Sequence, residues 1–218
     1  MRQISFQHFK KFLIFTALVM TILFFSKTDI KAEESEYNGL IEGDVFTDGW
    51  CEFKVTKAAT AEESGEVTLV KCVNKRIVGF CYGDYLYDIN DTDRVYDYDI
   101  VSIEENAFRN CSRLQTVQFN SKSKLTTIGK GAFRNCKKIK KIWVMSKLEM
   151  IENDAFSGCT KLTYFTTGSK NIKKVGKNAF KNCKNFKALA VPESKTKKYE
   201  KMFKKAGAKN VKARDMYE

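Results

Sequence analysis

The strongest constraint on this chain is a six-residue phrase that occurs four times. It reads NAFRNC at 106–111, GAFRNC at 131–136, DAFSGC at 154–159 and NAFKNC at 178–183. The Ala-Phe pairs follow one another at intervals of 25, 23 and 24 residues. Around each phrase, apolar residues recur at fixed offsets, giving the unit [IL]-x-x-[IV]-x-x-x-A-F-x-x-C-x-x-[LIF]-x-x-[VIFL]. One such unit cannot bury its apolar side alone, so this repetition predicts a stack of units that share a core.

The unit also predicts how each copy folds. Every length change falls between the last apolar position of one unit and the first of the next, which indicates a loop there. The stretch after each cysteine, such as LQTVQF at 114–119, predicts a short strand of the inner face. We expect the AFRNC segment to form a helical or 3₁₀ turn on the outer face. A period of 20–29 residues with apolar anchors is typical of a leucine-rich-repeat solenoid. We therefore expect an α/β repeat solenoid, a right-handed coil with short parallel inner strands.

The four repeated cysteines are predicted to be structural. Free cysteine behaves as a small hydrophobe, and here it recurs with the period of the core. A disulfide between successive repeat units, which we call rungs, needs Cα atoms within about 7 Å. A zinc site needs four thiolates around one point. A linear ladder favours neither, so we expect buried free thiols, no metal and no cofactor. The predicted core ladder consists of Phe108, Cys111, Phe133, Cys136, Phe156, Cys159, Phe180 and Cys183.

Three further cysteines lie before the repeats, at Cys51, Cys72 and Cys81. The total of seven is odd, so at least one thiol has no partner within the chain. Export makes oxidation feasible. If any pair forms, we expect it among these three.

The repeat resembles that of the BspA-like leucine-rich-repeat proteins, which are bacterial surface and secreted proteins. IGKGAFRNCKKIKKI at 128–142 is nearly a consensus copy, and the resemblance covers 100–192. VPESKTKKYEKMFKKAG at 191–207 resembles the lysine-rich closing helix of such arrays. The resemblance implies a binding or adhesion module without enzymatic activity. The sequence departs from the pattern at Glu104 and Glu152, where glycine is usual, and at Thr167, where an apolar residue is expected.

The repeats divide the chain into four expected parts: a secretory signal peptide at 1–32, an acidic β-rich N-terminal cap at 33–99, an array of four units at 100–192, and a basic C-terminal capping helix and tail at 193–218. Strands are predicted at 51–57, 65–73 and 76–82 of the cap. The alternative for this region is a separate binding domain. Near the C-terminus, Tyr199, Met202 and Phe203 have the 0, 3, 4 spacing of an amphipathic helix, ended by Gly207. Such a helix packs on the last repeat or, alternatively, binds a membrane surface.

The first 32 residues have the three-part form of a signal peptide. A basic start is followed by the 14-residue apolar run FLIFTALVMTILFF and a polar segment with Ala32 as the candidate cleavage residue. The run is shorter than the about 20 residues of a spanning helix, so no stable membrane span is expected after cleavage. An uncleaved anchor is the alternative. The expected location is secreted or at the cell surface.

Signal removal would also remove the only histidine, His8. A mature chain without histidine excludes Ser-His-Asp and Cys-His catalytic sites and mixed Cys/His zinc sites. A carboxylate enzyme acting on glycans is disfavoured too, because Glu104 and Glu152 occupy equivalent positions in two repeats. We therefore expect no catalytic residues and no enzyme activity.

Charge is divided between the two parts of the mature chain. Residues 33–100 carry a net charge of −10 and residues 101–218 a net charge of +19. In one interpretation, the two parts attract each other and their remaining charges keep the surface solvated. In the other, the basic part binds an anionic envelope polymer, a sulfated glycan or an anionic lipid. No nucleic acid partner is expected for an exported protein. The acidic segment 84–99 lacks the Gly and Glu that a calcium-binding EF-hand loop requires at its sixth and twelfth positions.

Alternation along the predicted strands gives a candidate contact surface. If Val117, Ile142 and Phe165 point into the core, their neighbours point outward. An outward tryptophan beside a lysine has the composition of an interaction hot spot. The alternative is that a loop or the C-terminal helix covers this tryptophan. The partner would be a protein or a glycan of unknown identity. The candidate ligand-contact residues are Thr116, Gln118, Lys141, Trp143, Tyr164 and Thr166.

Overall fold

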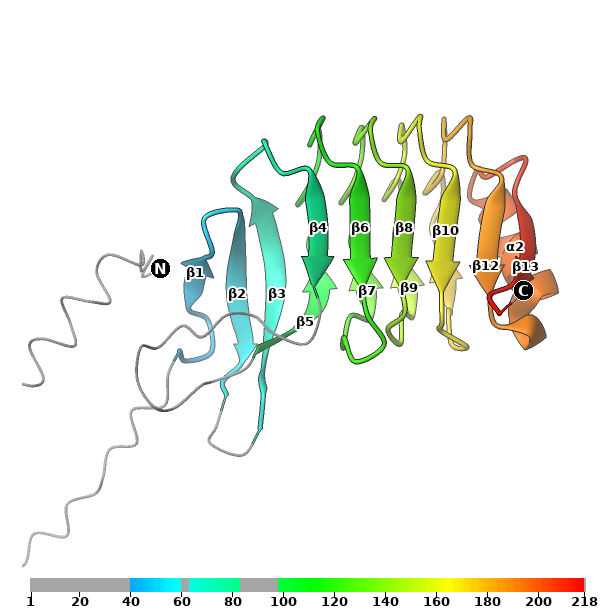
Figure 1. Cartoon of the computed structure of the whole chain (residues 1–218). Helices are drawn as coiled ribbons and strands as arrows, with labels where there is room; N and C mark the ends of the chain where they lie inside the picture. Colours follow the sequence, from blue (N-terminus) through cyan, green and yellow to red (C-terminus); the bar gives the residue numbers. More distant parts are fainter. Residues whose placement is uncertain (1–39, 60–62, 83–97, 218) are drawn as a thin grey trace, which may run out of the picture.

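The structure, a computed structural model, describes residues 40–59, 63–82 and 98–217. The predicted signal peptide at 1–32 and most of the acidic segment 84–99 lie outside these residues. The described parts form two β-sheets and one α-helix (Figure 1). No helix among them is long and apolar enough to cross a membrane.

The first sheet, which we call the front sheet, has six strands, and every neighbouring pair is parallel. The predicted parallel strands after each repeated cysteine are therefore confirmed. In Figure 1 these strands stand side by side and point the same way. The strands are β4 (Gly79–Tyr82), β6 (Thr116–Phe119), β8 (Lys141–Val144), β10 (Tyr164–Thr167), β12 (Ala188–Val191) and β13 (Lys212–Asp215).

The second sheet, the back sheet, receives one strand from the start of each unit. Its repeat strands are only two residues long, apart from the first, and they pair in parallel. The sequence does not predict these strands, because two residues are too few for an alternation pattern. Its strands in order are β1 (Val45–Thr47), β2 (Cys51–Lys57), β3 (Gly65–Cys72), β5 (Tyr98–Ile103), β7 (Thr127–Ile128), β9 (Met150–Ile151) and β11 (Lys174–Val175).

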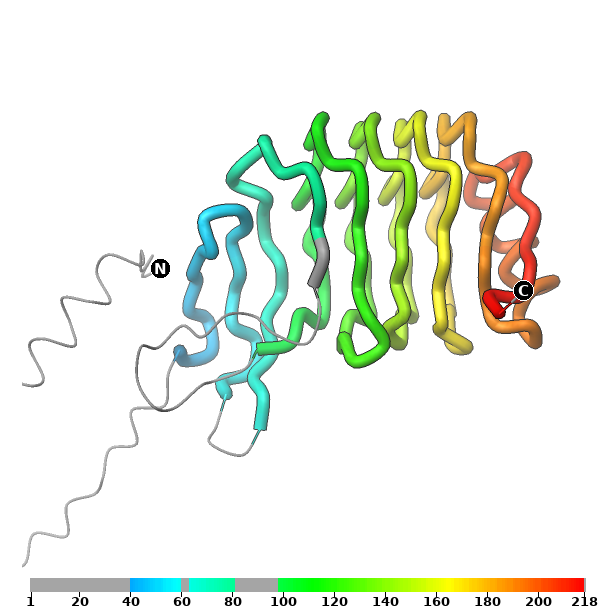
Figure 2. Tube along the Cα trace, viewed as in Figure 1, coloured from blue at the N-terminus to red at the C-terminus, as the bar shows by residue number. Residues whose placement is uncertain are grey.

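The AFRNC segments connect the two sheets as series of turns, and the expected helical or 3₁₀ turn is wrong. Asn106 and Asn110 have φ values of 60° and 62°, which lie in the left-handed region and stop a helix. The same two positions are left-handed in each later unit, with Asn135 at 61° and Gly158 at 80°. Figure 2 shows the same corner recurring from rung to rung along the stack. Asparagine and glycine are the residues that adopt this conformation most readily.

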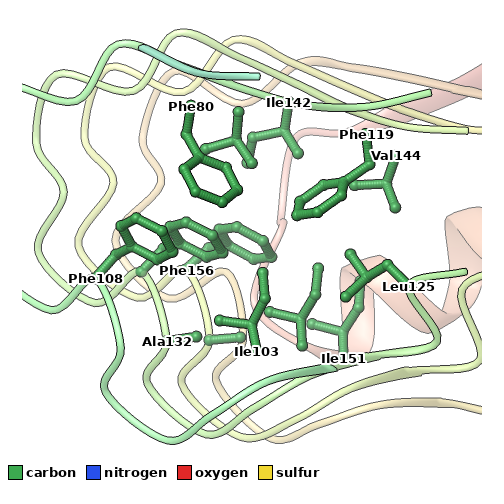
Figure 3. Packing of buried hydrophobic residues seen from close by; sticks show 14 of the residues in the cluster. Phe80, Ile103, Phe108, Phe119, Leu125, Ala132, Ile142, Val144, Ile151 and Phe156 are labelled. Carbon is green, nitrogen blue, oxygen red and sulfur yellow. The ribbon is translucent and has the colours of Figure 1, made fainter. Parts of the chain in front are cut away.

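A column of phenylalanine rings runs through the core between the sheets (Figure 3). Phe108 and Phe133 stack with ring centroids 4.9 Å apart, and Phe133 and Phe156 stack at 5.1 Å with planes only 2° apart. Phe180 continues the column at 5.3 Å from Phe156. Because each ring comes from the same position of its unit, the period of the sequence becomes the period of the core.

The repeated cysteines are buried beside this column as free thiols. The thiol of Cys136 donates to the carbonyl oxygen of Phe108 in the preceding rung at 2.9 Å. Cys159 and Cys183 repeat this bond to Phe133 and Phe156 at 3.2 and 3.1 Å. Burial raises the pKa of the Cys183 thiol to about 12 and that of Cys159 well above its usual value. Each of these cysteines therefore fills space in the core and donates a hydrogen bond to a carbonyl oxygen of the preceding rung.

Strand pairing continues beyond the four repeat units at both ends. In the N-terminal region, β3 pairs in parallel with β5, and β4 pairs in parallel with β6. At the other end, β13 adds a parallel strand to β12. The hairpin of β1 and β2 extends the back sheet in antiparallel fashion.

The helix α2 (Thr196–Lys205) follows a short 3₁₀ turn, Glu193–Lys195, and packs against the last repeat unit. The Phe203 ring stacks on Phe180 at 4.9 Å, and the hydroxyl of Tyr199 accepts a hydrogen bond from the N–H of Ile172 at 2.9 Å. Both aromatic side chains are fully buried. Gly207 follows the helix with φ of 103°, a conformation that suits glycine.

Candidate binding surface

The outward face of the front sheet carries two straight rows of side chains. Residues in direct register on adjacent parallel strands lie side by side, so each row contains one residue from each of β6, β8, β10, β12 and β13. The first row consists of Thr116, Lys141, Tyr164, Ala188 and Lys212. The second row consists of Gln118, Trp143, Thr166, Ala190 and Arg214. All six candidate contact residues therefore lie on one face, in the two rows.

Except at Thr166, which is buried, their exposure follows the alternation of the strands. The residues between the rows, such as Val117, Ile142 and Phe165, are buried in the core. Lys141 is exposed, whereas Trp143 and Tyr164 are half-buried. Part of each ring therefore remains accessible to a partner. A half-buried aromatic ring with fixed neighbours offers contact area at little entropic cost.

Two cation–π pairs lie on this face of the sheet. The Lys141 ammonium lies 5.6 Å from the centroid of the Trp143 ring on the same strand. The Arg214 guanidinium lies 5.5 Å from the Tyr164 ring, although β12 separates their strands. Arg214 can reach across because β12 presents only alanines outward at this point. Both rings thus lie beside a positive charge.

Thr166 occupies the centre of the second row with an exposed fraction of 6%. Its hydroxyl oxygen is buried and has no hydrogen-bond partner in the part of the chain that the structure describes. A buried hydroxyl without a partner costs free energy. The neighbours of Thr166 along the row are Trp143 and Ala190.

Sequence reasoning missed Lys212 and Arg214, because residues 193–218 were expected to form only a helix and a tail. The signal was nevertheless present in NVKARD at 210–215, where Val211 and Ala213 alternate with the two basic residues. Such alternation predicts a half-buried strand. The two basic residues extend the candidate surface by one strand and increase its positive charge.

The described residues offer no alternative site built for metal chemistry. Among them, no group of three or more His, Cys, Asp or Glu side chains could hold a metal ion. Glu152 instead accepts a hydrogen bond from the N–H of Lys130 at 3.0 Å, in the preceding unit. The candidate surface contains no Asp or Glu in its two rows.

Comparison with known proteins gives a clear family match. The sequence model of the BspA-type leucine-rich repeat region matches residues 85–211 in six copies. This span covers more than half of the chain and includes the four units found by alignment on the Ala-Phe pairs. The comparison with curated proteins finds no match.

Solved structures with some similarity come from three bacteria. A leucine-rich cell surface protein from Faecalibacterium prausnitzii is 21% identical with a TM-score of 0.44, over 68% of this chain and 37% of that one. A leucine-rich-repeat protein from Bacteroides ovatus is 26% identical with a TM-score of 0.44, over 73% and 36%. A leucine-rich-repeat protein of T. pallidum is 18% identical with a TM-score of 0.43, over 67% and 71%. The chain thus spans just over a third of the length of the first two.

Proposed function

Because this chain belongs to the BspA-type leucine-rich-repeat family, we propose that it is a non-catalytic binding protein that acts outside the cell or at its surface. The observation that carries the proposal is the pair of rows on the front sheet, in which Trp143 and Tyr164 lie beside Lys141 and Arg214. Flat sheet faces with ordered aromatic and basic residues suit protein contacts.

The partner we propose is a protein whose contact surface carries carboxylates. Three basic residues, Lys141, Lys212 and Arg214, belong to the two rows, and no acidic residue does. Complementary charge speeds association and rejects basic partners. The aromatic rings would supply most of the affinity, since hot spots in protein interfaces are enriched in Trp, Tyr and Arg. An adhesive role follows if that partner is on another cell.

Replacement of Trp143 tests the proposal. Proteins captured from an envelope extract by the immobilised chain would be purified and titrated against the wild type and Trp143→Ala. We expect the dissociation constant to rise about 30-fold, the effect of losing a hot-spot residue, with the melting temperature unchanged. The matched control is Trp50→Ala, which removes an exposed tryptophan outside the front sheet. Equal affinity of the two variants would contradict the proposal.

A second candidate function rests on net charge alone. Residues 101–218 carry +19, which favours binding to an anionic cell-wall polymer or sulfated glycan. Binding to immobilised heparin separates the two functions. Charge-driven binding weakens steeply between about 50 and 500 mM salt, because added salt shortens the Debye length and screens the charges. Such binding would also be insensitive to Trp143→Ala. A partner bound through the rows would retain most of its affinity at high salt.

The architecture outside the four aligned repeat units is also part of this proposal. We propose that 1–32 is a cleaved signal peptide, that 33–99 caps one end of the array, and that helix and tail at 193–218 close the other end. The contacts of Tyr199 and Phe203 with the last repeat support the closing role. A right-handed winding of the coil is favoured because crossovers between parallel strands almost always have that hand.

A further inference from the structure

Two cysteines outside the repeated ladder face each other in the N-terminal hairpin. Cys51 is the first residue of β2 and Cys72 the last of β3, and they are direct partners in the antiparallel register. Both have an exposed fraction of 0%. Because opposed residues of antiparallel strands project to the same face of the sheet, both sulfur atoms point into the core side by side.

Backbone hydrogen bonds identify the type of this pair. The N–H of Cys72 donates to the carbonyl of Ala107 at 2.8 Å, on the side away from β2. The carbonyl of Cys51 accepts from the N–H of Asp48 at 3.2 Å, on the side away from β3. Cys51 and Cys72 therefore form a non-hydrogen-bonded pair, in which Cα atoms lie about 4.5 Å apart and side chains come closest. Disulfides join Cα atoms about 4.4–6.8 Å apart.

We propose that Cys51 and Cys72 form a disulfide bond when the chain folds under oxidising conditions. Each thiol loses its proton, the two sulfurs form one bond, and two electrons pass to the oxidant. The oxidant is a low-molecular-weight disulfide, such as oxidised glutathione, which is reduced to two thiols by thiol–disulfide exchange. Because both sulfurs are buried in the folded chain, the exchange takes place before the hairpin closes.

Cys111 is the competing partner for Cys72. The Cys72 thiol interacts with both Cys111 and Cys51, and these interactions, together with burial, raise its pKa. Cys111 belongs to the ladder of the next rung, and the Lys75 ammonium lies 3.7 Å from its sulfur. Strand register places Cys51, not Cys111, directly opposite Cys72.

The bond would fix β2 to β3 at the open end of the hairpin. It closes a loop of about 20 residues, and loops of that size give a clear stabilisation when cross-linked. The oxidised chain should therefore melt about 5–10 °C above the reduced chain. This consequence does not depend on the proposed binding surface, which lies on the other sheet.

The test is a disulfide map of the full chain. The chain is refolded in a glutathione redox buffer, alkylated in denaturant without reductant, and digested with trypsin. We expect five of the seven cysteines to be alkylated. The tryptic peptide that ends at Lys54 should be joined to the peptide 72–75, and reductant should separate them. Seven free thiols, or a link from Cys72 to Cys111 or Cys81, would overturn the proposal.

Two variants sharpen the result. Cys51→Ser should leave Cys72 alkylated and lower the melting temperature of the oxidised chain to that of the reduced wild type. The matched control Cys183→Ala removes a buried ladder cysteine and should keep the joined peptides. If Cys51→Ser does not fold, the map of the wild-type chain still decides the question. A Cys72 thiol that is still protected from alkylation in Cys51→Ser would contradict the assignment.

Discussion

At the scale of the residue, the position before each repeated cysteine has a backbone role. Asn135 has φ of 61°, and its N–H donates to the carbonyl of Ser157 in the next rung at 2.8 Å. The left-handed conformation thus turns a backbone donor toward the neighbouring unit. Glycine replaces asparagine at the equivalent Gly158, where φ is 80°. The shared property of the two residue types is tolerance of positive φ.

Two substitutions at Asn135 should separate backbone conformation from side-chain contact. Asn135→Ala should lower the free energy of unfolding by about 1 kcal/mol, because alanine is strained at positive φ. Asn135→Gly should stay within about 0.5 kcal/mol of wild type, since glycine accepts this φ. Urea denaturation measures both, with exposed Lys137→Ala as the control. The explanation fails if alanine is tolerated as well as glycine.

Sequence reasoning found the buried residues of the repeat but not this backbone role. Phe133 and Cys136 recur with the apolar period, so their burial follows from the pattern alone. Asn135 is polar and recurs with the same period, which the unit recorded only as an unspecified position. The recurrence of Asn or Gly there was the available signal. Thr167 is a polar residue at a core position where the repeat predicts an apolar one. Its buried hydroxyl accepts a hydrogen bond from the N–H of Ser169 at 3.2 Å, a local bond that the sequence does not reveal.

At the scale of the element, helix α2 is tied to the array by one buried hydrogen bond. The hydroxyl of Tyr199 accepts from the N–H of Ile172 at 2.9 Å. Tyr199→Phe keeps the ring packing but leaves a buried N–H without an acceptor, so we expect a loss of about 1–3 kcal/mol in the free energy of unfolding. Tyr164→Phe is the matched control on the half-exposed front face and should change it little. Equal losses for the two variants would contradict this role.

Glu200 of the same helix covers the outer strand of the front sheet. Its carboxylate accepts from the Lys204 ammonium and, at 2.7 Å, from the N–H of Ala213 in β13. These two interactions, that of Lys204 first, lower the pKa of Glu200. The N–H of an edge strand is thereby bonded, which protects the edge from pairing with another chain.

The lowered pKa makes this contribution pH-dependent. A carboxyl group with a lowered pKa stabilises the fold above its unfolded pKa of about 4.3, and the stabilisation is lost as pH falls through the folded pKa. Glu200→Gln should therefore destabilise the chain by about 0.5 kcal/mol at pH 7 and by less at pH 3. Urea denaturation at both values tests this, with the more exposed Glu149→Gln as control. If Glu200→Gln lowered the free energy of unfolding as much at pH 3 as at pH 7, the charge of Glu200 would be excluded as the cause.

At the scale of the whole molecule, the middle of the array was predictable from sequence and its ends were not. The N–H of Cys72 bonds to Ala107 as the N–H of Phe108 bonds to Ala132, so Cys72 occupies the position of a repeat phenylalanine. Without the Ala-Phe pair, that rung has no recognisable copy of the unit. The same holds for the candidate surface. The outward position of Trp143 could be predicted from the alternation along its strand, whereas Arg214 lies on β13, in a last rung that has no recognisable copy of the unit.

The stacked core makes one prediction about the molecule as a whole, namely that energetic coupling stops at the nearest rung. In a linear stack, each unit contacts only its neighbours. Phe133 and Phe156 stack directly, whereas Phe108 and Phe180 are separated by both of these rings. A double-mutant cycle of Phe133→Leu and Phe156→Leu should give a coupling free energy of about 0.5–1.5 kcal/mol.

The matched cycle uses the same substitution at the two outer rings. Phe108→Leu and Phe180→Leu should be additive to within about 0.5 kcal/mol, because the residues share no contact. Using leucine in all four positions keeps the chemical change constant, so the comparison isolates distance along the stack. Urea denaturation of the four single and two double variants gives both cycles. Coupling of the outer pair as strong as that of the inner pair would mean that the core responds as one body and not rung by rung.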